Sequence, residues 1–326
     1  IIFHQAVESD NFNIKRVLPG IASSNEKTSD LEISKIFQFL DRYPQTQNII
    51  VNGGDPLLVS PTYYWELIDY INKKSLKTKI EINTNLWDFY KKPDRWRELF
   101  LHPSVKVGTS FELGGLRIIP PDRELTQNLF LEIMTFFKNE IGYFPDFISV
   151  ITKENIHLAL KNVELAKELN VQCKLNYAVK SGRQTSGLSI GDIHKIHLEI
   201  VKTKLTEHED NTRQIIQKVK GIGKNICPHT KDCDAGIRSL QPKSQSGYEY
   251  GSCGAFGDDQ KYPIDFDAEM NGDFFTPLRS KSELNFMKEE CLTCKNFNLC
   301  NSCYKTIIDH KESNLVESSC TKMKEF

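Results

Sequence analysis

Six short apolar runs alternate with helical patterns over roughly the first 205 residues of this 326-residue chain. The runs are mostly rich in β-branched and aromatic residues, as buried strands are. They comprise residues 1–7, 48–54, 79–85, 105–111, 147–152 and 172–179. Repeated strand–helix alternation predicts an α/β fold, a parallel sheet with helices outside it. An open doubly wound sheet and a full or partial barrel both satisfy this pattern, and both bind ligands at the carboxyl ends of the strands.

Two helix starts are marked by local signals. Ser29 and Glu32 have the spacing of a capping box, and the apolar spacing of residues 33–40 follows. Ser60 and Pro61 have the pattern of an N-cap followed by proline at the first helical position.

The charge and hydropathy of the chain argue against nucleic acid and membranes as partners. The net charge is −1 and the pI is about 6.8, which predicts no nucleic-acid or anionic-membrane surface. No apolar run approaches the ~20 residues of a membrane span, and no export signal is visible, so we expect a cytoplasmic protein. The first residue is Ile rather than Met, which is what removal of upstream residues would leave.

The nine cysteines are distributed very unevenly. None precedes Cys173, and eight lie at or after Cys227. We therefore expect a barrel or sheet domain at 1–205, a polar helix and linker at 206–226, and a metal-stabilised domain at 227–326. Cys173 lies in an apolar strand and is expected to be a buried small hydrophobe.

The tail cysteines have metal-ligand spacing. Cys291 to Cys303 form the block C-x2-C-x5-C-x2-C, in which thiolates two residues apart can hold one metal centre. Eight thiolates equal two four-cysteine sites. Zinc remains an alternative, although zinc ribbons usually separate such pairs by roughly 12–20 residues. Disulfides are a weaker alternative, because nothing indicates export.

The order C-x5-C-x19-C followed by C-x2-C-x5-C-x2-C-x16-C resembles the SPASM domain of radical SAM peptide-modifying enzymes. The resemblance implies a partial (β/α)6 barrel followed by an irregular α+β domain that holds two auxiliary 4Fe–4S clusters. The family usually has three residues between the last two cysteines of the block, where this chain has two, so Cys300 and Cys303 can exchange roles. Carried over by position, the first cluster would be held by Cys227, Cys233, Cys253 and Cys303. The second would be held by Cys291, Cys294, Cys300 and Cys320.

The sequence NGGDP at 52–56 resembles the family motif that meets the amino group of S-adenosylmethionine (AdoMet). Glycines at a strand end let a ligand approach the backbone closely. The residues that match are Gly53, Gly54, Asp55 and Pro56. INTN at 82–85, TSFE at 109–112 and KSGRQ at 180–184 fall where the family has its next strand ends. Whether AdoMet still binds is left open.

The catalytic cluster of the family has no ligands in this chain. In the family, three cysteines follow the first strand as C-x3-C-x2-C. The sequence FNIKRVLP at 12–19 fits that phrase without a gap, and Phe12, Arg16 and Pro19 fall at the three cysteine positions. Phe and Pro carry no donor atom, and Arg is permanently cationic. We therefore expect that radical SAM catalysis does not occur, and whether any other reaction is catalysed is left open.

The leading hypothesis is a degenerate radical SAM/SPASM protein that binds or presents a precursor peptide. Its nearest resemblance is to grasp-with-SPASM maturation systems, which implies an ATP-grasp ligase as a second partner. The alternatives are a redox or transferase enzyme that uses the auxiliary clusters, and a zinc-bound structural or interaction protein.

His194 and His197 lie three residues apart in a helical pattern. We expect both to be partly exposed, with no carboxylates completing a site around them.

Overall fold

The computed structural model describes residues 2–5, 31–53, 55–114, 117–119, 123–178, 187–222, 239–240, 250–251, 293–296, 320–321 and 324. The chain divides into two compact units. One comprises Ile1–Ile148 with Ile237–Ile264, and the other comprises Ser149–Gly236 with Asp265–Phe326.

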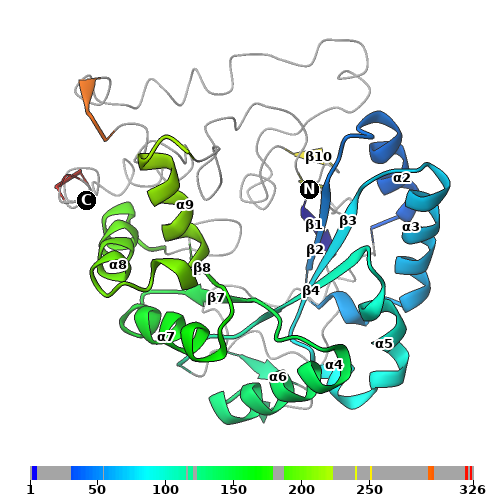
Figure 1. The fold of residues 1–326 in the computed structure, drawn as a ribbon, viewed down its shortest axis with the longest axis horizontal. Coiled ribbons are helices and arrows are strands. Elements are labelled where there is room, and N and C mark those ends of the chain that lie inside the picture. Colours follow the sequence, from blue (N-terminus) through cyan, green and yellow to red (C-terminus); the bar gives the residue numbers. More distant parts are fainter. Residues whose placement is uncertain are drawn as a thin grey trace. The chain divides into compact units, whose positions relative to one another are not determined.

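A parallel sheet forms the centre of the first unit (Figure 1). Its main strands are β1 (Ile2–Gln5), β2 (Asn48–Gly53), β3 (Lys79–Thr84) and β4 (Val105–Ser110). They lie in this order and are all parallel, with registers such as Ile50 opposite Glu81 and Ile82 opposite Val107. The α/β class and the parallel sheet expected from the sequence are therefore confirmed.

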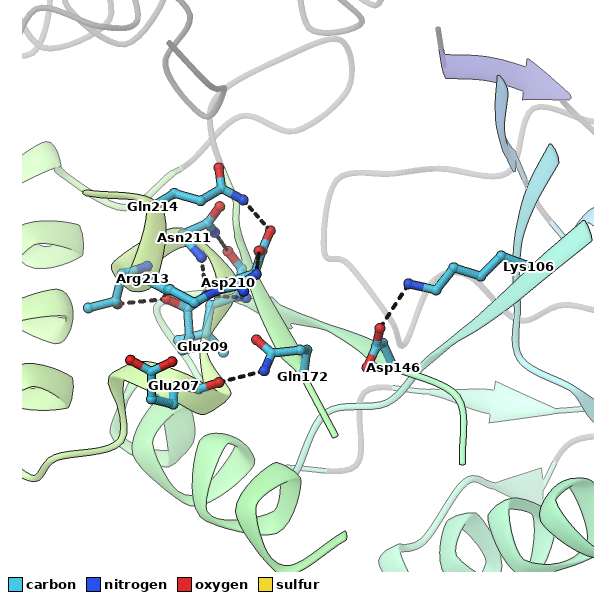
Figure 2. A network of polar contacts seen from close by, with 11 residues as sticks. Lys106, Asp146, Gln172, Glu207, Glu209, Asp210, Asn211, Arg213 and Gln214 are labelled. Carbon is cyan, nitrogen blue, oxygen red and sulfur yellow. Dashed lines mark hydrogen bonds and ion pairs between the residues drawn. The ribbon is translucent and has the colours of Figure 1, made fainter. Parts of the chain in front are cut away.

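Short strands extend this sheet at both ends. β9 (Ser239–Leu240) is parallel to β1, and β10 (Tyr250–Gly251) is antiparallel to β9. At the other end the first two residues of β7 (Phe147–Ile151) pair with β4. The ion pair of Lys106 and Asp146, at 3.0 Å, lies beside this pairing (Figure 2).

Five helices and a small hairpin complete the described part of the first unit. The helices are α2 (Ile33–Arg42), α3 (Pro61–Lys73), α4 (Trp87–Lys91), α5 (Pro93–Leu101) and α6 (Gln127–Ile141). A 3-10 turn, η1 (Pro56–Leu58), follows β2, and β5 (Ile118–Ile119) pairs antiparallel with β6 (Arg123–Glu124). Aromatic rings fill the space between α4, α5 and α6, where Phe89 lies 5.1 Å from Phe100 and 5.4 Å from Phe137 by ring centroids.

The two predicted helix starts have different outcomes. Ser60 Oγ accepts the Thr62 amide at 3.3 Å, with Pro61 at the first helical position, so this N-cap is confirmed. The capping box is wrong, because α2 begins at Ile33 and places Glu32 itself at the N-cap with no side-chain cap bond. Glu32 therefore lies before the first turn, where it cannot be the third residue of the helix.

The second unit contains the end of β7 and the elements that follow it. These are η2 (Ile156–Leu158), α7 (Ala159–Leu169), β8 (Cys173–Tyr177), α8 (Ile190–Lys202), η3 (Thr206–His208) and α9 (Asp210–Val219). β8 is the last strand in the order of the sheet, next to β7. None of the helices in the described ranges is long and apolar enough to cross a membrane.

Candidate functional site

The carboxyl ends of β2 and β3 are tied together by Asp55. Gly53 is the last residue of β2, and Pro56 is the first residue of η1. Asp55, between them, is only 5% exposed. Its Oδ1 accepts the Leu57 amide at 2.9 Å and the Thr84 hydroxyl at 2.7 Å, and its Oδ2 accepts the Asn85 amide at 3.1 Å.

These hydrogen bonds explain how a buried carboxylate is tolerated at this position. Burial raises the pKa of Asp55, while the bonds from Leu57, Thr84 and Asn85 and the charge of Arg117 act in the opposite direction. A carboxylate has about four lone-pair positions, and three of them are used within the chain. Asp55 therefore fastens one strand end to the next, with about one acceptor position left unused by these bonds.

A second acidic residue marks the end of β4. Glu112 is 2% exposed and accepts Arg117 Nε at 2.9 Å. The Asn83 side chain of β3 packs directly over Gly108 of β4, since a Cβ added to Gly108 would lie 2.2 Å from Asn83 Oδ1. The INTN and TSFE stretches singled out in the sequence thus provide polar groups to the carboxyl ends of β3 and β4, where α/β proteins bind ligands.

The predicted cluster ligands lie mostly outside the described residues. Of the eight, the structure describes Cys294 and Cys320, both half-buried. Among the described residues no group of three metal-binding side chains occurs. Gly54, Phe12, Arg16, Pro19 and KSGRQ at 180–184 also lie outside the described residues. Thiolates are the donor type that iron–sulfur clusters use, and the tail has eight cysteines at or after Cys227.

The second unit contains a buried polar cluster that the sequence reasoning missed. Cys173 is fully buried and its Sγ lies 3.6 Å from Ser149 Oγ, so its prediction as a buried small residue is confirmed. His194 and His197 are 3% and 0% exposed, so the prediction that they are partly exposed is wrong. They are buried because α8 turns this side inward, with the His197 ring at 5.4 Å from the Tyr177 ring.

Glu209 is a single buried carboxylate beside His197. It is 0% exposed, and its Oε2 lies 3.8 Å from His197 Nδ1. Oε1 accepts the amides of Leu175 at 3.0 Å and Asn211 at 3.1 Å, and Oε2 accepts the Thr212 amide and hydroxyl, both at 2.6 Å. Burial raises the pKa of Glu209, opposed by these four donors. The Asp-Asn-Thr sequence just after Glu209, typical of a helix start, is the signal that could have located it.

The histidines are held neutral. Burial lowers the pKa of His194 to about 4 and that of His197 to about 3. The Thr212 hydroxyl donates to Glu209, so it must accept from His197 Nδ1, at 2.7 Å. The proton of the neutral ring therefore lies on Nδ1, and its Nε2 has no hydrogen-bond partner within the described residues.

Solved structures share the architecture of this chain. anSMEcpe with bound AdoMet has a TM-score of 0.64 at 15% identity, over 98% of this chain and 94% of that chain. The chain has the fold of that protein. anSMEcpe with bound AdoMet and the Cp18Cys peptide matches at 0.63 and 16% identity, over 98% of this chain and 99% of that chain.

A further structure with the same fold is Streptococcus suis SuiB bound to its precursor peptide SuiA. Its TM-score is 0.59 at 15% identity, over 94% of this chain and 72% of that chain. No protein-family profile matches the chain. No curated protein matches it either.

Proposed function

We propose that this chain is a non-radical member of the radical SAM/SPASM superfamily that binds or presents a ribosomally made peptide during its maturation. The observation that carries the proposal is a fold shared with AdoMet-bound and peptide-bound proteins in a chain without a cysteine before Cys173. Without thiolates at Phe12, Arg16 and Pro19, the first strand has no ligands for a radical-generating cluster.

In this proposal, the eight cysteines from Cys227 to Cys320 are the ligands of two iron–sulfur clusters. One 4Fe–4S cluster would be held by Cys227, Cys233, Cys253 and Cys303, and the other by Cys291, Cys294, Cys300 and Cys320. When bound, such clusters supply one-electron redox capacity and a rigid frame for a segment with little regular structure. The proposed domains are a barrel at 1–205, a connection at 206–226 and the cluster domain at 227–326.

In this proposal the NGGDP motif has a structural role, and AdoMet is not used for radical chemistry. The Asp55 carboxylate is already bonded to Leu57, Thr84 and Asn85, which supports a structural use of the NGGDP motif. The peptide is the proposed principal partner, and an ATP-grasp ligase in the cytoplasm is the proposed second one.

The test begins with anaerobic purification of the whole chain. About eight iron atoms per chain, four per cluster, with an EPR spectrum that AdoMet does not change, is the expected result. About twelve iron atoms, or a spectrum that shifts on adding AdoMet, would refute the non-radical assignment. Zinc in place of iron would favour a structural or interaction protein, and turnover by the auxiliary clusters alone would favour a redox or transferase enzyme.

Peptide binding is tested separately, with the iron-loaded protein. A displayed library of linear peptides is selected on the chain, and the recovered peptides are measured in solution by fluorescence anisotropy. We expect saturable binding of at least one peptide at micromolar concentration or below. A selection that recovers no binder would remove the peptide partner from the proposal.

A further inference from the structure

Within the described residues, side chains and one isolated backbone bridge bond the outer edge of β8. β8 is the last strand in the order of the sheet. The Leu175 amide donates to Glu209 Oε1 at 3.0 Å, and the Leu175 carbonyl accepts from Asn211 Nδ2 at 2.7 Å. Figure 2 shows Glu209 and Asn211 together beside this strand.

These side chains reproduce what a neighbouring strand would offer. An added strand presents one carbonyl acceptor and one amide donor to such a residue, from backbone positions spaced by two. Glu209 and Asn211 are spaced by two and present one acceptor and one donor to Leu175. Residue 209 also forms an isolated parallel β-bridge with Cys173, and the Gln172 side chain donates to the Glu207 carbonyl. We call residues 207–211 the edge strap.

The edge strap is joined directly to α9. The Glu209 carboxylate accepts the Asn211 and Thr212 amides in the first turn, and Asp210 holds Arg213 at 2.8 Å and Gln214 at 2.6 Å. Displacing the strap would therefore loosen the first turn of α9 and the end of η3.

The closed arrangement leaves polar atoms unsatisfied. Within the described residues, three buried atoms of this turn have no hydrogen-bond partner: Asn211 Oδ1, Arg213 Nε and Gln214 Oε1. A buried polar atom without a partner is destabilising, and so is a buried carboxylate. The strap thus provides hydrogen-bond partners for the β8 backbone, but it leaves polar atoms of its own side chains without partners. A segment whose backbone pairs with β8 would not leave these atoms buried and unpaired, which favours its replacing the strap.

We propose that the outer edge of β8 is a strand-addition site for an extended segment of the peptide partner, and that the edge strap closes it in the free protein. The inference rests on the proposed function for its peptide. The parallel bridge between Cys173 and Glu209 sets the expected direction, with the segment parallel to β8. Main-chain bonds to Leu175 provide affinity that depends little on peptide sequence, as in other cases of strand addition.

The first experiment weakens the strap without removing its helix. Asn211→Ala deletes the donor to the Leu175 carbonyl and keeps the Glu209 contacts. Glu209→Gln places an amide donor where only hydrogen-bond donors converge, so it opens the strap further. Glu168→Gln is the control, because it changes an exposed carboxylate on α7, outside the edge strap.

The probe is a linear peptide selected on the wild-type chain. If the strap competes with the peptide, only protein with an open strap can bind. The apparent affinity is then the intrinsic affinity multiplied by the fraction of protein that is open. Both strap variants should therefore bind the peptide about tenfold more tightly than the wild type, with Glu168→Gln within about twofold of it. Unchanged or weaker binding by Asn211→Ala, in a variant whose circular dichroism matches the wild type, would overturn the proposal.

A second experiment uses the wild type alone, so it does not depend on how the variants fold. Hydrogen exchange is measured with and without the selected peptide. We expect slower exchange in β8 and faster exchange in residues 209–213 on binding, since the strap is displaced. Slower exchange in both segments would contradict displacement. Self-association of the strap variants without peptide would mean that the edge pairs with a second copy, which also contradicts the proposal.

The two failures are distinguishable. If no peptide binds the wild type, the proposed function fails. If a peptide binds and the exchange of β8 and residues 209–213 is unchanged, the function stands and the edge-strap inference fails.

Discussion

Thr84 Oγ1 donates a 2.7 Å hydrogen bond to Asp55 Oδ1, so the carboxylate that follows β2 is fastened to the last residue of β3. The two residues are 29 positions apart in the sequence. The bond makes Asp55 part of the frame of the sheet at the edge where ligands are expected.

Replacing Asp55 should therefore weaken the fold. Asp55→Ala removes the acceptor for two backbone amides and one hydroxyl, and two of these three hydrogen bonds are buried. We expect the free energy of unfolding to fall by about 3 kcal/mol. Urea denaturation followed by circular dichroism measures it. Asp69→Ala, an exposed carboxylate on α3, is the control and should change stability by less than about 0.5 kcal/mol. A neutral effect of Asp55→Ala would show that its hydrogen bonds do not stabilise the strand ends.

The buried histidines predict a loss of stability in acid. The pKa values of His194 and His197, about 4 and about 3 in the fold, lie below the ordinary 6.5, so the unfolded chain binds more protons as pH falls. Their contribution is complete above about pH 6.5 and is lost as the pH falls toward 4 and then 3. Each should contribute a slope of about 1.4 kcal/mol per pH unit in that window.

Histidine variants distinguish the pH dependence of the unfolding free energy that comes from the histidines from the part that comes from the carboxylates. His197→Asn keeps a polar atom near Thr212 but does not titrate, so its unfolding free energy should depend on pH less steeply than that of the wild type. His157→Asn, at an exposed position of η2, should keep the wild-type slope. Equal slopes in all three proteins would show that His197 titrates normally in the fold.

Substitution of Cys294 by Ala should lower the iron content of the chain, and substitution of Cys173 by Ala should not. Cys294→Ala removes a proposed cluster ligand and should lower iron from about eight to about four atoms per chain. Cys173→Ala removes a thiol that is fully buried beside Ser149, and its iron content should equal that of the wild type. Iron analysis and EPR of anaerobically purified protein provide the measurement. Loss of iron from the Cys173 variant would contradict a packing role.

Restoring three cysteines tests the non-radical assignment. The triple variant Phe12→Cys, Arg16→Cys and Pro19→Cys should bind about four more iron atoms after reconstitution, as one additional 4Fe–4S cluster. Its EPR spectrum should then respond to AdoMet, unlike that of the wild type. A variant with one position left unchanged, Pro19, serves as the control. No gain of iron in the triple variant would mean that these positions are not the ligand positions of the fold.

Local patterns predicted the parts of this protein that depend on neighbours in sequence. Strand-like runs separated by helical periodicity were enough for the parallel α/β fold, because buried strands and amphipathic helices each have their own spacing. The N-cap at Ser60 was predicted because its bond to Thr62 spans two residues. The capping box failed because the start of α2 is three residues later than the one that Ser29 would cap.

The α/β class, the absence of cysteine from the first 172 residues and the burial of Cys173 could all be predicted from local sequence patterns. Three contacts became visible only in the folded chain: Asp55 with Thr84, His197 with Thr212, and Glu209 with the Leu175 amide of β8. The physical reason is distance along the chain. A polar side chain is stable in the interior only where its partners converge, and here those partners come from elements 15 to 34 residues away.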